Sequence, residues 1–260
     1  MNIRSRVRSG EVLVGTWMSG CNPVYAELCA LADLDFVIID MEHGLIGLED
    51  IVPILQALRA GGKTAALVRV PSHDATMIAR VLDRGVDGIV VPKVEDVAEA
   101  RGVVAAAKYP TTGSRGVAIG VIRASQYGMN PGYRHTANDE ILICLQIESR
   151  RAVENAAAVA AVDGVDILFI GPSDLAADMN LEGPINTQNL IGVIDGTIAT
   201  LCTQGFRVGT MPHAGRDWQS LAQMGVTLHA TGSDVQFLRQ GIASIKSTVP
   251  SRKESDGAAK

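Results

Sequence analysis

Short apolar runs alternate with longer stretches of mixed polar and apolar residues along the whole 260-residue chain. The run FVIID at residues 36–40 is typical of a strand buried on both faces, as in parallel sheets. The predicted strands are residues 12–18, 36–40, 65–70, 88–91, 141–148, 167–171, 206–210 and 226–231. Stretches with helical spacing lie between them at 23–32, 48–60, 75–84, 94–107, 150–162, 187–203 and 216–224, and another helix is predicted at 233–246.

The repeated order of strand and helix predicts a parallel sheet with right-handed crossovers. Eight such strands within roughly 230 residues fit a closed (β/α)8 barrel, the TIM barrel of the α/β class, better than an open sheet. We expect one domain over residues 1–248, without a linker or an internal repeat, and a polar, disordered tail at 249–260. Residues 109–139 form a long segment rich in glycine and polar residues, which is typical of a functional or interface loop.

The composition narrows the class of protein. A hydrophobic content of 47% with 20% charged residues is ordinary for a globular protein with a sizeable core. A net charge of -5, only 4% aromatic residues and no basic stripe argue against nucleic-acid binding. No apolar run approaches the ~18 residues of a membrane span, and the start does not resemble a secretory signal. The four cysteines are scattered along the chain, which favours buried free thiols. We therefore expect a cytoplasmic protein without a membrane or nucleic-acid partner.

Candidate chemistry gathers at the ends of four predicted strands. His43, Arg69, Glu148 and Asp174 each lie at or just after an apolar run. The carboxyl ends of parallel strands meet at one rim of a barrel, so these side chains should converge although they are far apart in sequence. A base, a fixed cation and two carboxylates at a barrel mouth predict a metal-assisted enzyme.

Glu148 and Asp174 are the candidate metal ligands. Magnesium and manganese accept two carboxylates and fill their other positions with water and substrate oxygens. An α-keto acid would chelate such an ion, which would then stabilise an enolate as a Lewis acid. The alternative is that either carboxylate caps a helix, and Asp174 in the GPSDL segment is well placed to do so.

Arg69 ends an apolar strand, where an arginine needs an anionic partner. Its fork of donors suits a carboxylate or a developing enolate oxygen. An internal ion pair with Glu148 or Asp174 is the alternative.

His43 follows a buried strand and is a candidate base that titrates near neutral pH. It needs a carboxylate partner to set its tautomer and basicity. Asp40 is close in sequence, whereas Asp83 would be close only if the barrel closes as predicted. The alternative is an ordinary surface histidine, and His213 is the best candidate among the other histidines.

Together these motifs resemble the HpcH/HpaI aldolase family, which are metal-dependent class II aldolases that act on pyruvate-type donors. The matching segments are IDMEHG, VRVP, GIVVPKVEDVAEA, KYPTTGSRG, QIESRRAVEN, GVDILFIGPSDLAADMN and a late GSD, in this order from about Gly15 to Asp234. The resemblance covers nearly the whole chain.

The resemblance implies a role for each matching residue. His43 is similar to the family's general base, Asp83 to the carboxylate that raises its basicity, and Asp40 is in the same motif and would help to orient it. Arg69 resembles the arginine that stabilises the enolate. The implied metal ligands are Glu148 and Asp174, and the implied substrate-binding residues are Gln146, Ser173, Asp174 and Trp17.

The resemblance also implies a reaction and an assembly. The reaction is the reversible cleavage of a 4-hydroxy-2-oxo acid to pyruvate or hydroxypyruvate and an aldehyde, with Mg²⁺, Mn²⁺ or Co²⁺ stabilising an enolate. One alternative is an oxaloacetate decarboxylase or another enolate-forming enzyme, macrophomate-synthase-like or citrate-forming, in which Tyr133 would supply a proton or a hydrogen bond. Another is a catalytically silent barrel. Family members are hexamers, trimers of dimers, that exchange the last helix, here residues 233–246, and residues 109–139 would help to form the neighbour's site.

Three departures from the family pattern concern the aldehyde. Ser173 stands where alanine is common in a GPAD motif, Gly-Leu-Ile-Gly follows His43, and the segment at residues 209–213 is individual to this chain. All three should border the aldehyde pocket, so the sequence leaves the natural acceptor open.

Overall fold

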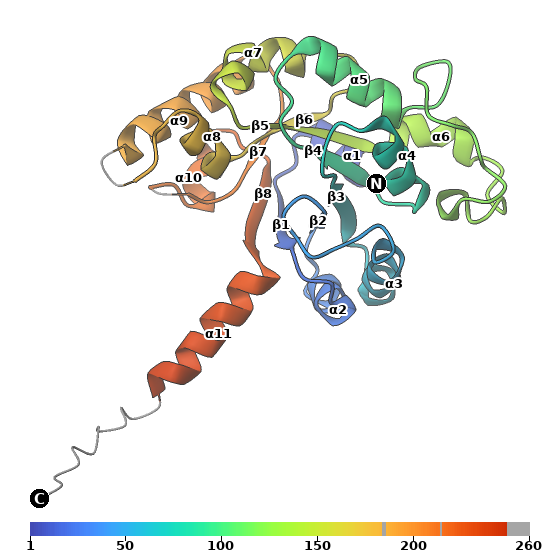
Figure 1. The fold of residues 1–260 in the computed structure, drawn as a ribbon, viewed down its shortest axis with the longest axis horizontal. Coiled ribbons are helices and arrows are strands. Elements are labelled where there is room, and N and C mark those ends of the chain that lie inside the picture. The colour runs from blue at the N-terminus through green and yellow to red at the C-terminus, as the bar shows by residue number, and fades with distance from the viewer. Residues whose placement is uncertain (184–185, 214, 249–260) are drawn as a thin grey trace, which may run out of the picture.

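In the computed structural model, eight parallel strands form one closed barrel in which β8 returns to pair with β1 (Figure 1). The strands are β1 (Leu13–Met18), β2 (Phe36–Asp40), β3 (Ala65–Arg69), β4 (Gly88–Val91), β5 (Leu142–Ile147), β6 (Ile167–Ile170), β7 (Val208–Thr210) and β8 (Leu228–Ser233). The structure describes residues 1–183, 186–213 and 215–248, so the tail predicted at 249–260 lies outside the described residues. The predicted (β/α)8 barrel is confirmed, and all eight strands lie within two residues of their expected ends.

Helices alternate with the strands, and most of them cover the outside of the barrel (Figure 1). The α-helices are α1 (Ile3–Ser9), α2 (Pro23–Leu31), α3 (Ile51–Gly61), α4 (Ala75–Asp83), α5 (Val97–Ala107), α6 (Tyr133–Glu140), α7 (Arg150–Ala160), α8 (Pro172–Asp178), α9 (Thr187–Thr203), α10 (Trp218–Gln223) and α11 (Asp234–Thr248), with a short 3₁₀ turn at Arg123–Ser125. None of these helices in the described part of the chain is long and apolar enough to cross a membrane.

Three helices were not among the predicted elements, and each is short. The N-cap of α1 is Asn2, whose side chain accepts a hydrogen bond from the Ser5 N–H, and its C-cap is Gly10 in the left-handed conformation. α6 lies within the long segment at residues 109–139 and buries only Ala137, so its sequence carries almost no apolar periodicity. α8 has only seven residues, which is too short for a periodic pattern to develop.

Two apolar layers explain why the strand sequences are continuous apolar runs. Inside the barrel, side chains such as Phe36, Ile38 and Phe169 pack against one another and are fully or almost fully shielded from solvent. The opposite faces of the same strands pack against the surrounding helices. Gly15 is needed in β1 because a Cβ atom there would lie 2.2 Å from the Phe36 carbonyl oxygen.

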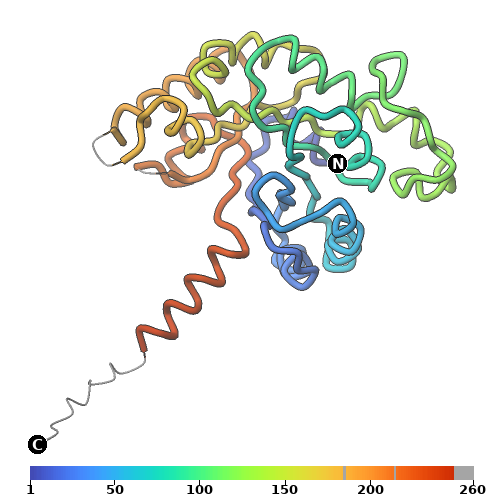
Figure 2. The backbone as a smooth tube through the Cα atoms, in the orientation of Figure 1, coloured from blue at the N-terminus to red at the C-terminus, as the bar shows by residue number. Residues whose placement is uncertain are grey.

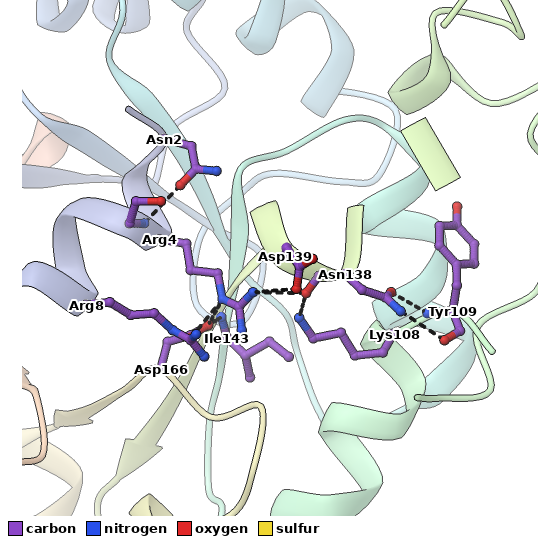
Figure 3. A network of polar contacts seen from close by, with 10 residues as sticks. Asn2, Arg4, Arg8, Lys108, Tyr109, Asn138, Asp139, Ile143 and Asp166 are labelled. Carbon is purple, nitrogen blue, oxygen red and sulfur yellow. Dashed lines mark hydrogen bonds and ion pairs between the residues drawn. The ribbon is translucent and has the colours of Figure 1, made fainter. Parts of the chain in front are cut away.

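A polar network closes the end of the barrel at which the strands begin (Figure 3). The Arg4 Nε donates to both oxygens of Asp166, at 2.9 and 3.0 Å, and the Arg8 Nε donates to the same carboxylate at 2.8 Å. The buried Lys108 ammonium donates to the Asn138 carbonyl oxygen. Burial lowers the pKa of Lys108 to about 8. This end is occupied by structural ion pairs, which leaves the opposite rim for a site.

Helix α11 leaves the barrel after β8 and extends away from it, as both views of the chain show (Figures 1 and 2). The apolar residues Leu238, Ile242 and Ile245 lie on one side of this helix at helical spacing, and each is about two-thirds exposed. A row of this kind requires a covering surface that the single chain does not provide within the described residues.

Candidate active site

A cavity of about 270 Å³ opens at the rim where the strands end. Its walls come from the ends of β1, β2, β3, β5, β6 and β8, from the loops after these strands and after β7, and from the starts of α8 and α11. The lining residues are Trp17, Ser19, Asp40, His43, Arg69, Gln146, Phe169, Gly171, Pro172, Ser173, Asp174, Met211, Gly232, Ser233 and Gln236. The structure therefore brings together most of the residues that the strand-end argument and the motifs predicted.

Arg69 is held rigidly by Asp40. The two residues are register partners at the ends of β2 and β3, and both side chains are buried. The Arg69 Nε donates to Asp40 Oδ1 at 2.8 Å and Nη2 donates to Oδ2 at 2.7 Å, which is a bidentate arrangement. Burial raises the pKa of Asp40, but the hydrogen bonds and charge of Arg69 outweigh burial and hold the pKa below its ordinary value. The ion pair that was the alternative interpretation of Arg69 exists, but its partner is Asp40 rather than Glu148 or Asp174.

The other contacts of Arg69 fix the plane of its guanidinium. Nη1 lies 3.3 Å from Glu42 Oε2, and the guanidinium carbon lies 4.6 Å from the centre of the Trp17 ring. Trp17 packs edge-on against Phe169 at 5.8 Å, and its buried Nε1 has no hydrogen-bond partner among the described residues. A buried donor without a partner beside a cavity is available to a bound ligand.

The loop that carries His43 is held by Asp40 through the backbone. Asp40 Oδ1 accepts hydrogen bonds from the N–H groups of Glu42, at 3.1 Å, and His43, at 3.3 Å. The imidazole itself is 57% exposed, and its Nε2 lies 3.7 Å from Glu42 Oε1. Gly44 is required in this turn because a Cβ atom there would lie 2.2 Å from the Asp40 carbonyl oxygen. Asp40 therefore orients the His43 backbone, and the carboxylate nearest the ring belongs to Glu42.

Asp83 does not join this group. It is the last residue of α4, which runs back from the rim to the end of the barrel at which β4 begins. There its Oδ1 accepts a hydrogen bond from Arg115 Nη2 at 2.7 Å. Barrel closure therefore does not bring Asp83 to His43 within one chain, because a crossover helix runs antiparallel to the strand that precedes it. The role of Asp83 toward His43 stays a prediction.

Glu148 follows β5 and is 4% exposed. Its Oε1 accepts the Lys93 N–H at 2.9 Å, and its Oε2 accepts a hydrogen bond from the Gln146 side-chain amide. Gly171 makes room for this carboxylate, since a Cβ atom there would lie 2.9 Å from Glu148 Oε2. A second hollow, of about 460 Å³, adjoins the cavity and is lined by both Glu148 and Asp174.

Neither carboxylate caps a helix, which removes the alternative explanation for their positions. The N-cap of α8 is Gly171, and Asp174 lies inside the first turn of that helix. The N-cap of α7 is Ser149, whose side chain accepts the Ala152 N–H.

The electrostatics at Glu148 fit a cation. Burial, and after it the negative charges of Asp174 and Glu42, raise the pKa of Glu148 to about 7. The buried Gln146 Oε1 has no hydrogen-bond partner in the described part of the chain. These donors are hard oxygen ligands, which Mg²⁺ and Mn²⁺ prefer. Residues 1–183, 186–213 and 215–248 contain no group of three His, Cys, Asp or Glu that could hold a metal, so an ion would take two carboxylates and complete its shell with water and substrate oxygens.

Sequence reasoning missed two charged residues beside these carboxylates. Glu42 is within the IDMEHG motif but was assigned no role, and Lys93 follows β4 at the same rim. The strand-end argument that found Arg69 would also have found Lys93. His213, by contrast, is not part of the cavity lining, and its Nδ1 contacts the Met211 carbonyl oxygen at 3.0 Å.

Known proteins resemble this chain over nearly its whole length. A family model described as HpcH/HpaI aldolase/citrate lyase matches residues 13–241. A 4-hydroxy-2-oxovalerate aldolase from Novosphingobium aromaticivorans is 38% identical over 233 residues, which cover 90% of this chain and 88% of that protein. A hydroxypyruvate/pyruvate aldolase from Roseovarius nubinhibens is 35% identical over 237 residues, which cover 91% of this chain and 92% of that protein.

The fold comparison agrees with the sequence comparison. The crystal structure of an HpcH/HpaI aldolase/citrate lyase family protein from Burkholderia cenocepacia J2315 superposes with a TM-score of 0.85 at 32% identity, covering 94% of this chain and 98% of that one. Since the family model spans the barrel and these relatives exceed 30% identity over nearly the full chain, this protein belongs to the HpcH/HpaI aldolase/citrate lyase family.

Proposed function

We propose that this protein is a class II aldolase, a carbon–carbon lyase that reversibly cleaves 4-hydroxy-2-oxo acids to pyruvate or hydroxypyruvate and an aldehyde. The observation that carries the proposal is the buried Arg69–Asp40 pair, which fixes a guanidinium in the same cavity as His43, Gln146 and Asp174. Two relatives are named as aldolases, one for 4-hydroxy-2-oxovalerate and one for hydroxypyruvate and pyruvate, which supports this reaction class.

Glu148 and Asp174 would hold a divalent cation, Mg²⁺, Mn²⁺ or Co²⁺. The bound ion would supply Lewis acidity toward the oxygens of a 2-oxo acid. Glu148 is kept in place by the Lys93 N–H and the Gln146 amide, which limits its motion when the ion exchanges.

Arg69 would act on the charge that develops during cleavage. When the bond between C3 and C4 of the substrate breaks, its electron pair moves into the pyruvyl unit and negative charge grows on the keto oxygen. A donor that is already oriented stabilises this charge without reorganisation during the reaction. The bidentate bond to Asp40 and the face of Trp17 provide that orientation.

His43 would accept the proton of the C4 hydroxyl, whose oxygen becomes the aldehyde carbonyl. The exposed imidazole lies at the cavity wall, where it can exchange that proton with solvent. Trp17 and Gln146 each present a buried polar atom without a partner among the described residues, and together with Ser173 they would bind the pyruvyl unit. Protonation of the enolate at C3 then completes pyruvate.

The test is a metal-dependent aldol assay. Purified protein with Mn²⁺ should form new carbon–carbon bonds from pyruvate or hydroxypyruvate and small aldehydes, and EDTA should abolish this activity until the ion is restored. Activity that persists in EDTA would refute the metal mechanism. Loss of oxaloacetate at a rate well above that of aldol cleavage would instead favour the decarboxylase alternative.

We further propose that one aldolase domain, residues 1–248, assembles as a homohexamer, a trimer of dimers, in which α11 packs against a second copy. The support is physical: Leu238, Ile242 and Ile245 lie on one side of the detached helix α11. A second apolar row on α2, Val24, Leu28 and Leu31, is also 58–66% exposed and has the same spacing. Replacing Leu238 and Ile242 together with aspartate should yield monomers in light scattering, whereas an unchanged hexamer would refute the exchange.

We place the enzyme in the cytoplasm on the basis of its cysteines. All four are free, and Cys29 and Cys144 are buried as small apolar side chains. Free thiols of this kind suit a reducing compartment.

A further inference from the structure

Lys93 lies directly after β4 and has a strained backbone. Its φ of 54° is in the left-handed region, which residues with a side chain adopt rarely and at a cost in free energy. Such a conformation persists only where the surroundings hold it. In this case it points the main-chain N–H of Lys93 at the site described above.

Of the three carboxylates Glu42, Glu148 and Asp174, two contact Lys93. Its N–H donates to Glu148 Oε1 at 2.9 Å, and its ammonium lies 3.4 Å from Glu42 Oε1. The Lys93 side chain is 64% exposed, whereas that of Glu42 is only 8% exposed. Lys93 also lines the hollow that contains Glu148 and the third carboxylate, Asp174.

The charges around this hollow are unevenly compensated. Arg69 donates two hydrogen bonds to Asp40, and its Nη1 lies 3.3 Å from Glu42 Oε2. Among the described residues, Lys93 is the other lysine or arginine whose side chain contacts Glu42, and its N–H contacts Glu148. A divalent cation that binds between Glu148 and Asp174 would lie in the hollow that Lys93 also lines, and like charges within one hollow oppose each other even when water screens them.

We propose that Lys93 is a positioning residue that sets the affinity of the site for its divalent cation: its N–H orients Glu148, while its ammonium holds Glu42 and weakens cation binding as an internal counter-ion. This inference rests on the proposed function, because it takes Glu148 and Asp174 as the ligands. It predicts that removal of the ammonium tightens cation binding, whereas loss of a purely structural residue would weaken it.

The experiment is calorimetric titration of Mn²⁺ into protein stripped with EDTA, at low ionic strength. Lys93→Met keeps the length of the side chain and removes its charge, so the dissociation constant should fall by about three- to tenfold. Lys93→Gly retains the N–H without strain and should behave similarly. Lys93→Arg, which retains the charge, should stay within about twofold of the wild type. Lys63→Met, an exposed lysine before β3, should leave the constant unchanged.

High salt provides a second readout, since the difference between wild type and Lys93→Met should shrink as screening increases. If the wild type binds Mn²⁺ normally and both Lys93→Met and Lys93→Gly bind it equally or more weakly, the role of Lys93 alone is overturned. Absence of Mn²⁺ binding by the wild type would overturn the metal site and this inference together.

Discussion

Replacing Asp40 with asparagine tests the central geometry of the site. The substitution keeps the shape of the side chain but removes its charge and one of the two acceptors that bind Arg69. Removing one partner of a buried ion pair typically costs 3–5 kcal/mol, because the remaining charge is left without compensation. Glu42 lies 3.3 Å from Arg69 Nη1 and offsets part of this loss, so we expect the free energy of unfolding to fall by about 2–3 kcal/mol.

Turnover should fall further than stability alone would explain. Asp40→Asn also frees the plane of the guanidinium, and a misplaced catalytic group of this kind costs on the order of 10²-fold in rate. The assay is aldol cleavage at saturating Mn²⁺, with urea unfolding measured on the same preparation. We expect kcat to fall by about two orders of magnitude while the protein remains folded under assay conditions.

Asp166 provides the matched control. It is also a buried aspartate paired with an arginine, Arg4, whose Nε donates to both carboxylate oxygens, but it lies at the end of the barrel where the strands begin. Asp166→Asn should lower the free energy of unfolding by a comparable amount and leave the kcat of the folded enzyme unchanged. If Asp40→Asn kept kcat within threefold of the wild type, or if Asp166→Asn lowered kcat equally, the orienting role of Asp40 would have to be abandoned.

Two further predictions concern other groups. Glu148→Gln preserves shape and removes one ligand charge, so calorimetry should show Mn²⁺ binding weakened by at least about 10²-fold; near-normal binding would exclude Glu148 as a ligand. Burial lowers the pKa of Lys108 from 10.5 to about 8. At pH 7 the folded protein therefore carries a free-energy cost for keeping Lys108 charged. This cost fades as the pH rises from 8 towards 10.5, where the unfolded chain also loses the proton. Urea unfolding should therefore show that Lys108→Met stabilises the protein by about 2 kcal/mol more at pH 7 than at pH 10, and an equal effect at both pH values would contradict this assignment.

The strands could be predicted well because burial on both faces leaves a simple signal, a run of apolar residues with no polar position. Helix starts were predicted less accurately than strand ends, because some helices begin a few residues after the predicted position. Residues 48–50, for example, form a turn in which the Gly47 N–H is bound by Asp50, and α3 starts only at Ile51. Helices α1 and α8, with seven residues each, end before a repeating pattern can be recognised.

The site was predictable to the extent that it depends on strand ends. His43, Arg69 and Asp174 line one cavity because all parallel strands end at the same rim. The pairing of side chains was not predictable, since it depends on the register between strands, and Asp40 faces Arg69 only because β2 and β3 align these two residues. The place of Asp83 was not predictable in the same way, because it depends on the direction of α4, which carries this residue away from the rim where the strands end.

The register also resolves the two interpretations of Arg69 that the sequence left open. An ion pair and a role in catalysis were alternatives only while the partner of the arginine was unknown. A guanidinium has five N–H groups, and Asp40 engages only Nε and one N–H of Nη2. The pair thus removes the cost of burying the charge and leaves donors at the cavity for an oxygen that becomes negative. The same bond that stabilises the fold at the end of β3 is what makes Arg69 usable by the chemistry.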